Sequence, residues 1–514
     1  MSDISNEKMA ATEKTTGTES PTPEIHGEDH HGPKDGPAWM YRRIFGLPAY
    51  ASPLFQVIFV AFVCFLCPGM FNAVNGLGAA GQVNAHDINN AGTAIYATFS
   101  VVGFFAGSIA NKIGLRLTLG IGGFGYFLYI ASILSYNHNQ NAGFLIFAGA
   151  LLGACAGLLW TAQGAVMLAY PPEHKKGRYI GLFWAIFNLG AVIGALIPLG
   201  QNIHEQTARK VKDGTYIAFI VLMGAGFVLA AFLCNPRFVR RDDGTRVIMM
   251  KNPTWKSEIT GMIKVLFTDW YLILLFPMFF ASNWFYTYHF QDVNLPKFNI
   301  RTRALNNVLY YMSQIIGSLI FGFLLDTTRF SRPARARAVI VALLVLTIVI
   351  WGAGYDFQKG YTRQSTLLDE NFVPMDWSDS GYVGPMFLYM FYGAFDSVWQ
   401  TTSYWLMGSL TNNSRKLACF TGFYKGIQSA GGAISPQLDA NNVSFVAQWG
   451  TNLGLLTFSL LVAAPVIWTK VKETTDLDED LKFTDETRAD VLPPSALGAV
   501  PAAEAGMAER QEKL

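Results

Sequence analysis

Charged residues are scarce in this sequence. Of 514 residues only 14% are Asp, Glu, Lys or Arg, whereas 51% are hydrophobic and the mean hydropathy is +0.27. Soluble proteins carry roughly 25% charged residues. The charges lie almost wholly between long apolar runs, and the net charge of +2 gives no basis for nucleic-acid binding. The composition predicts an all-α polytopic protein whose main partner is the lipid bilayer.

Cysteine is also rare, and its surroundings indicate no redox or metal chemistry. The five cysteines fall within or at the ends of apolar runs. Cys64 and Cys67 form a C-x-x-C pair, but the pair lies inside a predicted spanning helix. We expect no metal and no cofactor. No nucleophile, base and orienting group converge at a readable spacing, so the sequence does not predict an enzyme.

Twelve apolar segments approach the length of about 20 residues that crosses a bilayer. The first fifty or so residues are polar, so we expect no cleavable signal peptide there. The first predicted helix is then expected to act as the insertion signal. The first six helices are predicted at Pro53–Asn75, Ala91–Ala110, Leu117–Tyr136, Ala142–Tyr170, Tyr179–Leu199 and Tyr216–Cys234. The second six are predicted at Leu266–Phe290, Ala304–Leu325, Ala338–Tyr355, Tyr382–Leu410, Leu417–Pro436 and Phe445–Thr469.

The predicted organisation is two helical bundles between polar tails. Its parts are a disordered tail (1–45), a six-helix bundle (46–234), a basic connector (235–264), a second six-helix bundle (265–470) and a disordered tail (471–514). One set of connectors holds 18 Lys and Arg residues and the opposite set holds 8. The positive-inside rule therefore places both termini in the cytoplasm, without distinguishing the plasma membrane from an endomembrane.

The two bundles look like copies of one unit. Gly107 and Gly322 are 215 positions apart. Four residues after each of them, a polar residue (Asn111 or Asp326) ends the apolar run, and cationic residues follow. Beyond the longer loop in the second half the offset grows to 237, so that Gln163 matches Gln400 and Asn188 matches Lys425. A repeat of this kind is typical of transporters built from duplicated bundles.

A parallel six-plus-six repeat with a basic central loop resembles the major facilitator superfamily. The resemblance implies a gating loop motif, G-x-x-x-D-[RK], of which both halves hold degenerate copies. The first copy has Asn where the family has Asp. The motif positions are Gly107, Asn111, Lys112 and Arg116 in the first half, and Gly322, Asp326 and Arg329 in the second.

A narrower resemblance rests on four stretches. They are CPGMFNAVNGLG (67–78), LWTAQGAVMLAYP (159–171), KGRYIGLFWAIFNLGAVIG (176–194) and GFYKGIQSAG (422–431). These are similar to the unc-ninety-three-like branch found in fungi and plants. The branch implies two kinds of function: some members look like transporters, and animal members act as accessory proteins of channels or receptors.

Two charges at predicted membrane depth stand out, Asp396 and Lys425. A charge at mid-bilayer costs several kcal/mol, so such residues face the protein interior and usually form an ion pair or have a functional role. We expect them to form a proton- or cation-responsive pair. A permanent structural ion pair is an equal alternative.

The resemblance also implies that helices 1, 4, 7 and 10 line a cavity. Amides with indole faces suit a neutral or weakly charged solute, although Asn and Gln also hold helices together. The candidates for solute binding are Asn72, Asn75, Trp160, Gln163, Asn283, Trp399, Gln400 and Ser403. The aromatic stretch 284–290 is expected to form a belt at the outer rim rather than a binding box, with His289 in water.

The sequence thus predicts a transporter that moves a small solute, with a proton as the candidate coupling ion, by alternating tilt of two bundles. The alternative is a facilitator fold that no longer transports and instead regulates or traffics another membrane protein. Three features favour this alternative: the departure at Asn111, the lack of ionisable side chains at membrane depth in the first six helices, and long tails able to recruit partners. The paired amides and the charges of Asp396 and Lys425 favour transport.

Overall fold

The computed structural model describes residues 36–76, 85–202, 213–249, 251–493 and 496. Apart from two isolated β-bridges, the regular structure of these residues is helical. The first half contains α1 (Pro53–Cys64), α2 (Met70–Gly76), α3 (Ala85–Ile113), α4 (Leu115–Asn139), α5 (Ala142–Ala169), α6 (Lys176–Asn202) and α7 (Asp213–Ala230). The connector contains α8 (Trp255–Thr268).

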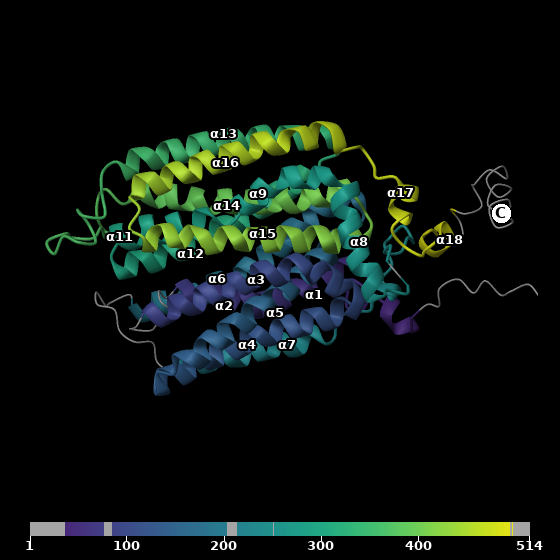
Figure 1. Ribbon diagram of the computed structural model, residues 1–514, viewed down its shortest axis with the longest axis horizontal. Coiled ribbons are helices and arrows are strands. Elements are labelled where there is room, and N and C mark those ends of the chain that lie inside the picture. Colours follow the sequence, from purple (N-terminus) through teal and green to yellow (C-terminus); the bar gives the residue numbers. More distant parts are fainter. Residues whose placement is uncertain (1–35, 77–84, 203–212, 250, 494–495, 497–514) are drawn as a thin grey trace, which may run out of the picture. The chain divides into compact units, whose positions relative to one another are not determined.

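The second half repeats this organisation with more interruptions. It contains α9 (Phe276–Ala281), α10 (Phe285–Thr287), α11 (Leu295–Lys297), α12 (Ile300–Leu325), α13 (Arg332–Gln358), α14 (Val383–Leu410), α15 (Ser414–Ala440), α16 (Phe445–Lys470), α17 (Leu477–Leu481) and α18 (Arg488–Val491). Each of the twelve predicted helices has a counterpart. The long helices run side by side in Figure 1.

Within the described part of the chain, eight helices are long and apolar enough to cross a membrane. The number is nine if α8 and the run Trp270–Lys297, bent by 77°, count as one span. Helix α7 is apolar but shorter, and α14 and α15 are long but carry polar side chains in their middle turns. The number of twelve crossings therefore stays a prediction.

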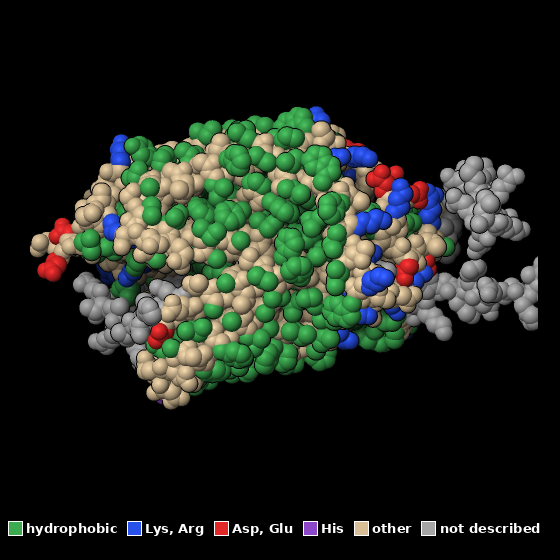
Figure 2. Space-filling model, in the orientation of Figure 1, with side chains coloured by type: hydrophobic (Ala, Val, Ile, Leu, Met, Phe, Trp, Pro, Cys, Tyr) green, Lys and Arg blue, Asp and Glu red, His purple; other side chains and the backbone are tan. Residues whose placement is uncertain are grey.

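Side-chain chemistry divides the surface as a bilayer requires. Figure 2 shows hydrophobic side chains spread over the flanks of the helices, while Lys, Arg, Asp and Glu gather at the end that carries α8, α17 and α18. We call this the α8 end. Lipid-facing helices expose apolar side chains because the hydrocarbon offers no hydrogen-bond partner.

The two halves meet mainly along two helix pairs, and α5 and α6 also contact α14 and α15. Helix α6 packs on α12, and α3 packs on α15. The seam is tight where glycines lie on both sides: a Cβ at Gly107 would lie 2.6 Å from the carbonyl oxygen of Ala418, and a Cβ at Gly322 would lie 2.5 Å from that of Gly177. Small residues allow such close backbone approach between membrane helices.

The first helix of each half is interrupted. Between α1 and α2 lies a π-helical turn, Phe65–Gly69, that contains Pro68. In the second half, the prediction of one continuous helix at Leu266–Phe290 is wrong. The chain bends after α8, starts again at Trp270, loosens at 282–284 and forms a π-helical turn at Tyr288–Asn294. Proline and local loosening of the hydrogen-bond ladder are common causes of such breaks.

Part of the expected disorder is also corrected. Residues 471–493 hold α17 and α18 and contact the connector: Asp485 accepts backbone N–H bonds from Lys251 (2.6 Å) and Asn252 (3.0 Å). Near the N-terminus, the Tyr41 hydroxyl donates to the carbonyl oxygen of Phe238 (3.0 Å). The remaining residues of both predicted tails, 1–35, 494–495 and 497–514, lie outside the described residues.

The seam generates a first prediction. Gly107→Val places carbon atoms where the backbone of Ala418 and Cys419 already lies, so the helices must separate. We expect a loss of about 1–3 kcal/mol in unfolding free energy, measured as a lower thermal midpoint in detergent. Gly120→Val is the matched control because a Cβ there meets nothing within 4 Å. Equal midpoints for the two variants would contradict the close seam.

Candidate functional site

The carboxylate of Asp396 lies at the centre of a buried polar network in the second half. It sits on α14 and is fully buried. One oxygen accepts bonds from the Gln314 amide (2.9 Å) and the Tyr310 hydroxyl (3.3 Å), both on α12. The other accepts from Gln400 (3.3 Å), one turn along α14. The Tyr286 side chain hydrogen-bonds the carboxylate as well. Its partners are therefore neutral donors.

Two glutamines connect Asp396 to Lys425. The Gln400 side-chain oxygen accepts from the Gln428 amide (3.0 Å), and the Gln428 oxygen accepts from the Lys425 ammonium (2.7 Å). The hydrogen-bonded path between carboxylate and ammonium is thus relayed through two amides. Gln428, one turn after Lys425 on α15, did not feature among the predicted residues because a lone Gln in a helix is usually packing glue.

Lys425 also reaches the first half. Its ammonium lies over the ring of Trp160 on α5, 4.4 Å from the centroid, and near the rings of Tyr424 (4.9 Å) and Tyr404 (5.3 Å). Such cation–π contacts strengthen when the cation is desolvated. The Tyr404 hydroxyl donates to the Gln163 oxygen (3.2 Å), again across the seam. The predicted residues Trp160, Gln163, Gln400, Asp396 and Lys425 therefore lie in one cluster.

Other predicted residues contribute less to this cluster. The Trp399 indole donates to the Met278 carbonyl (3.3 Å) and the Ser282 hydroxyl (3.0 Å), and Ser403 donates to the Trp399 carbonyl (3.0 Å). The Trp399 bonds join α14 to the broken seventh helix, whereas the Ser403 bond lies within α14. Asn72 and Asn283 are partly exposed. The side chain of Asn75 lies outside the described residues.

The break in the seventh predicted helix supplies backbone acceptors. The Ser282 carbonyl accepts from the Gln400 amide (2.9 Å), and the Met278 carbonyl accepts from Trp399. Loosened backbone at membrane depth occurs where it faces protein or a cavity. Broken helices in corresponding positions of two repeats mark transporter sites.

The aromatic stretch 284–290 is not a rim belt. Phe285, Tyr288 and His289 are buried, and the His289 ring stacks on Tyr392 with centroids 4.3 Å apart. The expectation of a solvated histidine is wrong because the helix break turns these side chains into the bundle. The apolar run 266–290 is typical of one continuous helix, so the sequence gave no sign that these side chains turn inward.

At the α8 end, Asp326 joins the halves. Following α12, it accepts backbone N–H bonds from Gly177 (2.8 Å) and Arg178 (2.7 Å) in the first turn of α6. Carboxylates are stabilised at helix N-termini by these free N–H groups and by the helix dipole. Burial nevertheless raises the pKa of Asp326 to about 6. The close approach of Gly322 and Gly177 brings the two helices into register for this contact.

Lys176 makes the reciprocal contact. Its buried ammonium donates to the carbonyls of Gly408 (2.6 Å) and Thr411 (3.3 Å), at the C-terminal end of α14, and to the Asn412 side chain (2.5 Å). Cations suit helix C-termini for the converse reason. We call the contacts of Asp326 and Lys176 the end latch. In the sequence, Lys176 begins the family stretch 176–194, and nothing in that stretch assigned it a role of its own.

The first copy of the loop motif forms weaker contacts. The Asn111 amide donates to the Arg415 carbonyl (3.3 Å), at the start of α15, and Lys112 donates to the Pro253 carbonyl (2.8 Å). Arg116 bonds the Ala231 carbonyl within its own half. Asn111 thus contacts the first turn of α15, and Asp326 contacts the first turn of α6, so the two motif positions make equivalent contacts across the seam. Arg329 of the second copy is exposed.

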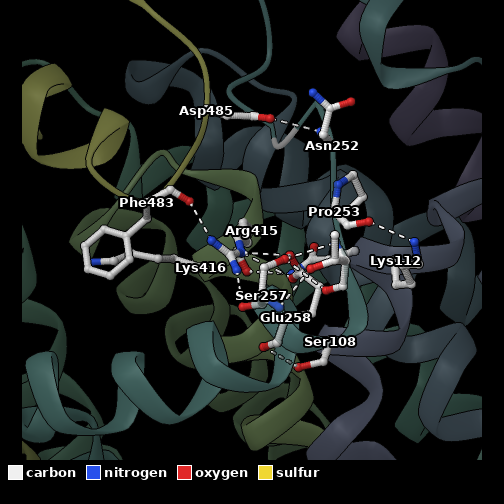
Figure 3. A network of polar contacts seen from close by, with 12 residues as sticks. Ser108, Lys112, Asn252, Pro253, Ser257, Glu258, Arg415, Lys416, Phe483 and Asp485 are labelled. Atoms are coloured by element: carbon white, nitrogen blue, oxygen red, sulfur yellow. Dashed lines mark hydrogen bonds and ion pairs between the residues drawn. The ribbon is translucent and has the colours of Figure 1, made fainter.

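A charged network reinforces this side of the α8 end (Figure 3). Arg415 pairs with Glu258 of α8 (3.1 Å) and donates to the Phe483 carbonyl of the tail (3.0 Å). The Lys416 ammonium lies 3.9 Å from the centre of the Phe483 ring. Ser108 of α3 donates to the Glu258 carbonyl (3.2 Å). Connector and tail therefore bind both halves where α3 meets α15.

Comparisons with known proteins agree with this architecture. The Major Facilitator Superfamily model matches residues 57–436. An UNC93-like protein of Schizosaccharomyces pombe is 50% identical over 93% of this chain and 95% of its own length. UNC93-like protein 1 of Arabidopsis thaliana is 44% identical over 84% of this chain and 94% of its own length. The chain belongs to the UNC93-like branch of the major facilitator superfamily.

Solved structures support the fold of this UNC93-like chain. The fucose:proton symporter of Escherichia coli aligns over 82% of this chain and 98% of its own, with a TM-score of 0.57 and 14% identity. A proton:xylose symporter aligns over 82% and 96%, with a TM-score of 0.58 and 13% identity. The all-helical facilitator fold and the family predicted from sequence are confirmed.

A second prediction concerns the end latch. Lys176→Met removes three donors that cap α14 across the seam, leaving buried carbonyls unpaired at a cost of about 1–3 kcal/mol. We expect the α8 end to open more often. Spin labels at Leu117→Cys and Ala334→Cys report the distance between halves, and the native cysteines are buried and do not compete for label. The control is Lys175→Met, whose partly exposed ammonium lies 3.8 Å from Asp242 within its surface surroundings. An unchanged distance distribution in Lys176→Met contradicts the latch.

A third prediction follows from Asp326. An open end would return this carboxyl from a pKa of about 6 to its ordinary 3.8, so closure binds a proton. Acid therefore favours closure: the contribution, at most about 3 kcal/mol, is complete below about pH 4 and is lost as pH rises through about 6. In Asp326→Asn the same label distance should lose this pH dependence, because the amide does not titrate and its one oxygen still accepts from one of the two N–H groups. A pH response identical to that of the parent chain refutes the assignment.

Proposed function

We propose that this UNC93-like protein is a secondary transporter that moves a small, neutral or weakly charged solute by alternating access and couples the movement to a proton at Asp396. The observation that carries the proposal is the chain Asp396–Gln400–Gln428–Lys425, which ends on Trp160 of the other half. A purely structural role needs no ammonium at the seam between the halves that is linked through two amides to a carboxylate inside the second half.

The network gives protonation a mechanical consequence. An ionised Asp396 is an acceptor for Gln400, Gln314 and Tyr310, whereas a protonated carboxyl has one acceptor position fewer and a hydrogen to donate. Release of Gln400 frees its oxygen and amide to rearrange with Gln428, and Lys425 then loses its amide acceptor. The cation–π contact with Trp160 changes as a result, and with it the fit of the two halves.

The proposed solute site lies beside this network. Trp160 and Gln163 supply an aromatic face and an amide from the first half, and Lys425 and Tyr404 contact them from the second. Asn72, Asn75 and Asn283 remain candidates for a more open state. The end latch at the α8 end, which we assign to the cytoplasm, is closed here, so the described state corresponds to one with cytoplasmic access blocked.

The test, our fourth prediction, is uptake into proteoliposomes from a panel of labelled neutral and weakly charged solutes under an inward proton gradient. Asp396→Asn should lose accumulation by roughly tenfold or more while retaining solute exchange, because only coupling requires the proton. Gln163→Ala should weaken solute affinity by roughly tenfold, through loss of a buried hydrogen bond. Asp369→Asn, at an exposed loop carboxyl, is the control.

The outcomes separate cleanly. Uptake by the parent chain with the expected losses supports coupled transport. Equal flux in the parent, Asp396→Asn and Gln163→Ala proteins means that the network does not carry transport. Absence of uptake for every solute, with folded protein verified by thermal midpoint, counts against the transporter assignment.

A further inference from the structure

The chain that follows the last long helix runs back across the α8 end. Residues 473–491 include α17 and α18, which lie beyond the ends of the bundle helices in Figure 1. These residues meet, in order, the loop between α5 and α6, the loop between α14 and α15, and the connector. We call this segment the tail strap. Because it leaves α16 of the second half, each of its contacts with the first half crosses between the halves.

The first crossing is at Glu173, between α5 and α6. Its carboxylate accepts the backbone N–H of Thr475 (2.9 Å) and pairs with Arg332, the first residue of α13. Arg332 in turn donates its backbone N–H to Glu473 (2.8 Å) and its guanidinium to the Lys472 carbonyl (2.5 Å). One carboxylate of the first half is therefore bound by the tail strap and by α13 together.

The second crossing runs through the connector. The Arg241 guanidinium donates to the carbonyls of Ala169 (2.8 Å) and Tyr170 (3.0 Å), at the end of α5, and so fixes the start of the connector to the first half. Five residues later, the backbone N–H of Arg246 donates to the Val491 carbonyl (3.0 Å). The far end of the tail strap is therefore also attached to the first half.

Between the two crossings, the tail strap supports the loop that receives Lys176. The Asp480 carboxylate, on a residue only 4% exposed, accepts from the Thr411 hydroxyl (2.5 Å) and the Asn412 backbone N–H (3.1 Å). The Asn412 side chain donates to the Thr475 hydroxyl (2.5 Å), and its oxygen accepts from Lys176. The Thr411 carbonyl is a further acceptor of the same ammonium. The tail strap thus fixes the loop on which the end latch depends.

Phe483 attaches the tail strap to α8 and α15. Its carbonyl accepts from Arg415, and its ring lies between two ammonium groups, with Lys416 at 3.9 Å and Lys264 of α8 at 5.2 Å from the centroid (Figure 3). Such cation–π contacts each add a modest attraction. The tail strap is therefore held along its length and not only at its two crossings.

These contacts oppose any separation of the halves at the α8 end. Hydrogen bonds weaken once donor and acceptor move a few tenths of an ångström beyond their usual distance. A segment that is bonded to both halves cannot follow both when they move apart. Opening must then break the contacts of the tail strap at Glu173, at Asp480 or at the connector, so these contacts stabilise the closed end.

We propose that the tail strap is an autoinhibitory segment, which holds the α8 end closed and must be released before that end opens. Asp480 is its central residue, because this buried carboxylate joins the tail strap to the loop that receives Lys176. The inference rests on the opening that the proposed function requires. It goes beyond that function by naming the segment that restrains the opening.

The fifth prediction concerns Asp480→Asn in the full chain. The substitution replaces one acceptor oxygen by an NH2 group that faces other donors. We expect the population with a long distance between labels at Leu117→Cys and Ala334→Cys to rise about fivefold, measured by pulsed electron spin resonance in nanodiscs. Hydrogen exchange of 411–413 and 475–491 should accelerate by a similar factor. Glu479→Gln is the matched control, because this neighbouring acid loses the same charge but is exposed.

The two measurements separate the tail strap from the end latch and from transport. An increase in both for Asp480→Asn, with parent values for Glu479→Gln, supports autoinhibition whether or not any solute is found. An unchanged distance distribution in Asp480→Asn overturns it, even where Lys176→Met opens the end and coupled transport is demonstrated. This holds also where exchange accelerates, because the tail strap then leaves without opening. Should Asp480→Asn fail to fold, Glu173→Gln, which weakens the first crossing, decides by the same measurements.

Discussion

A bilayer interior offers polar groups nothing to bond with, and the second half of this molecule is arranged around that constraint. Asp396 and Lys425 could not remain charged beside lipid, since each would cost several kcal/mol. They lie instead on α14 and α15, where neutral amides and tyrosine hydroxyls satisfy them. This explains why these two helices are the least lipid-like of the long helices. Their polar middle turns need the other helices as a screen.

The two halves contribute different kinds of side chain to the buried polar network. The first half contributes an aromatic face and an amide, Trp160 and Gln163, and no charge to the network. The second half contributes the groups that can titrate. At the α8 end the exchange is mutual: Asp326 of the second half caps the start of α6, and Lys176 of the first half caps the end of α14. Backbone groups at helix ends thereby hold the two halves together at the α8 end, alongside the ion pairs of Arg415 with Glu258 and of Arg332 with Glu173.

Sequence reasoning recovered the parts of this design that depend on composition and repeat spacing. Long apolar runs gave the helices, and the offsets of 215 and 237 residues brought Gly107, Gln163 and Lys425 into correspondence with their partners. The break in the seventh predicted helix could not be predicted, because the aromatic residues around Phe285 form an ordinary apolar run in the sequence. Gln428 and Lys176 escaped notice for a similar reason. Each belongs to a residue type common in its setting, and only the three-dimensional contact distinguishes it.

Helix α14 belongs to both the Asp396 network and the end latch. It carries Asp396 and Gln400 in its middle and presents the Gly408 carbonyl to Lys176 at its end. Gln400 and Gly408 are eight residues apart, which corresponds to about 12 Å along a helix. Over that length an α-helix behaves as a rigid element, so a tilt that changes the network must also pull the Gly408 carbonyl from its cap. Conversely, a latch that holds the end of α14 favours the arrangement in which Gln400 bridges Asp396 and Gln428. In the mechanism that we propose, the protonation state of Asp396 and the closure of the α8 end therefore both depend on the position of α14.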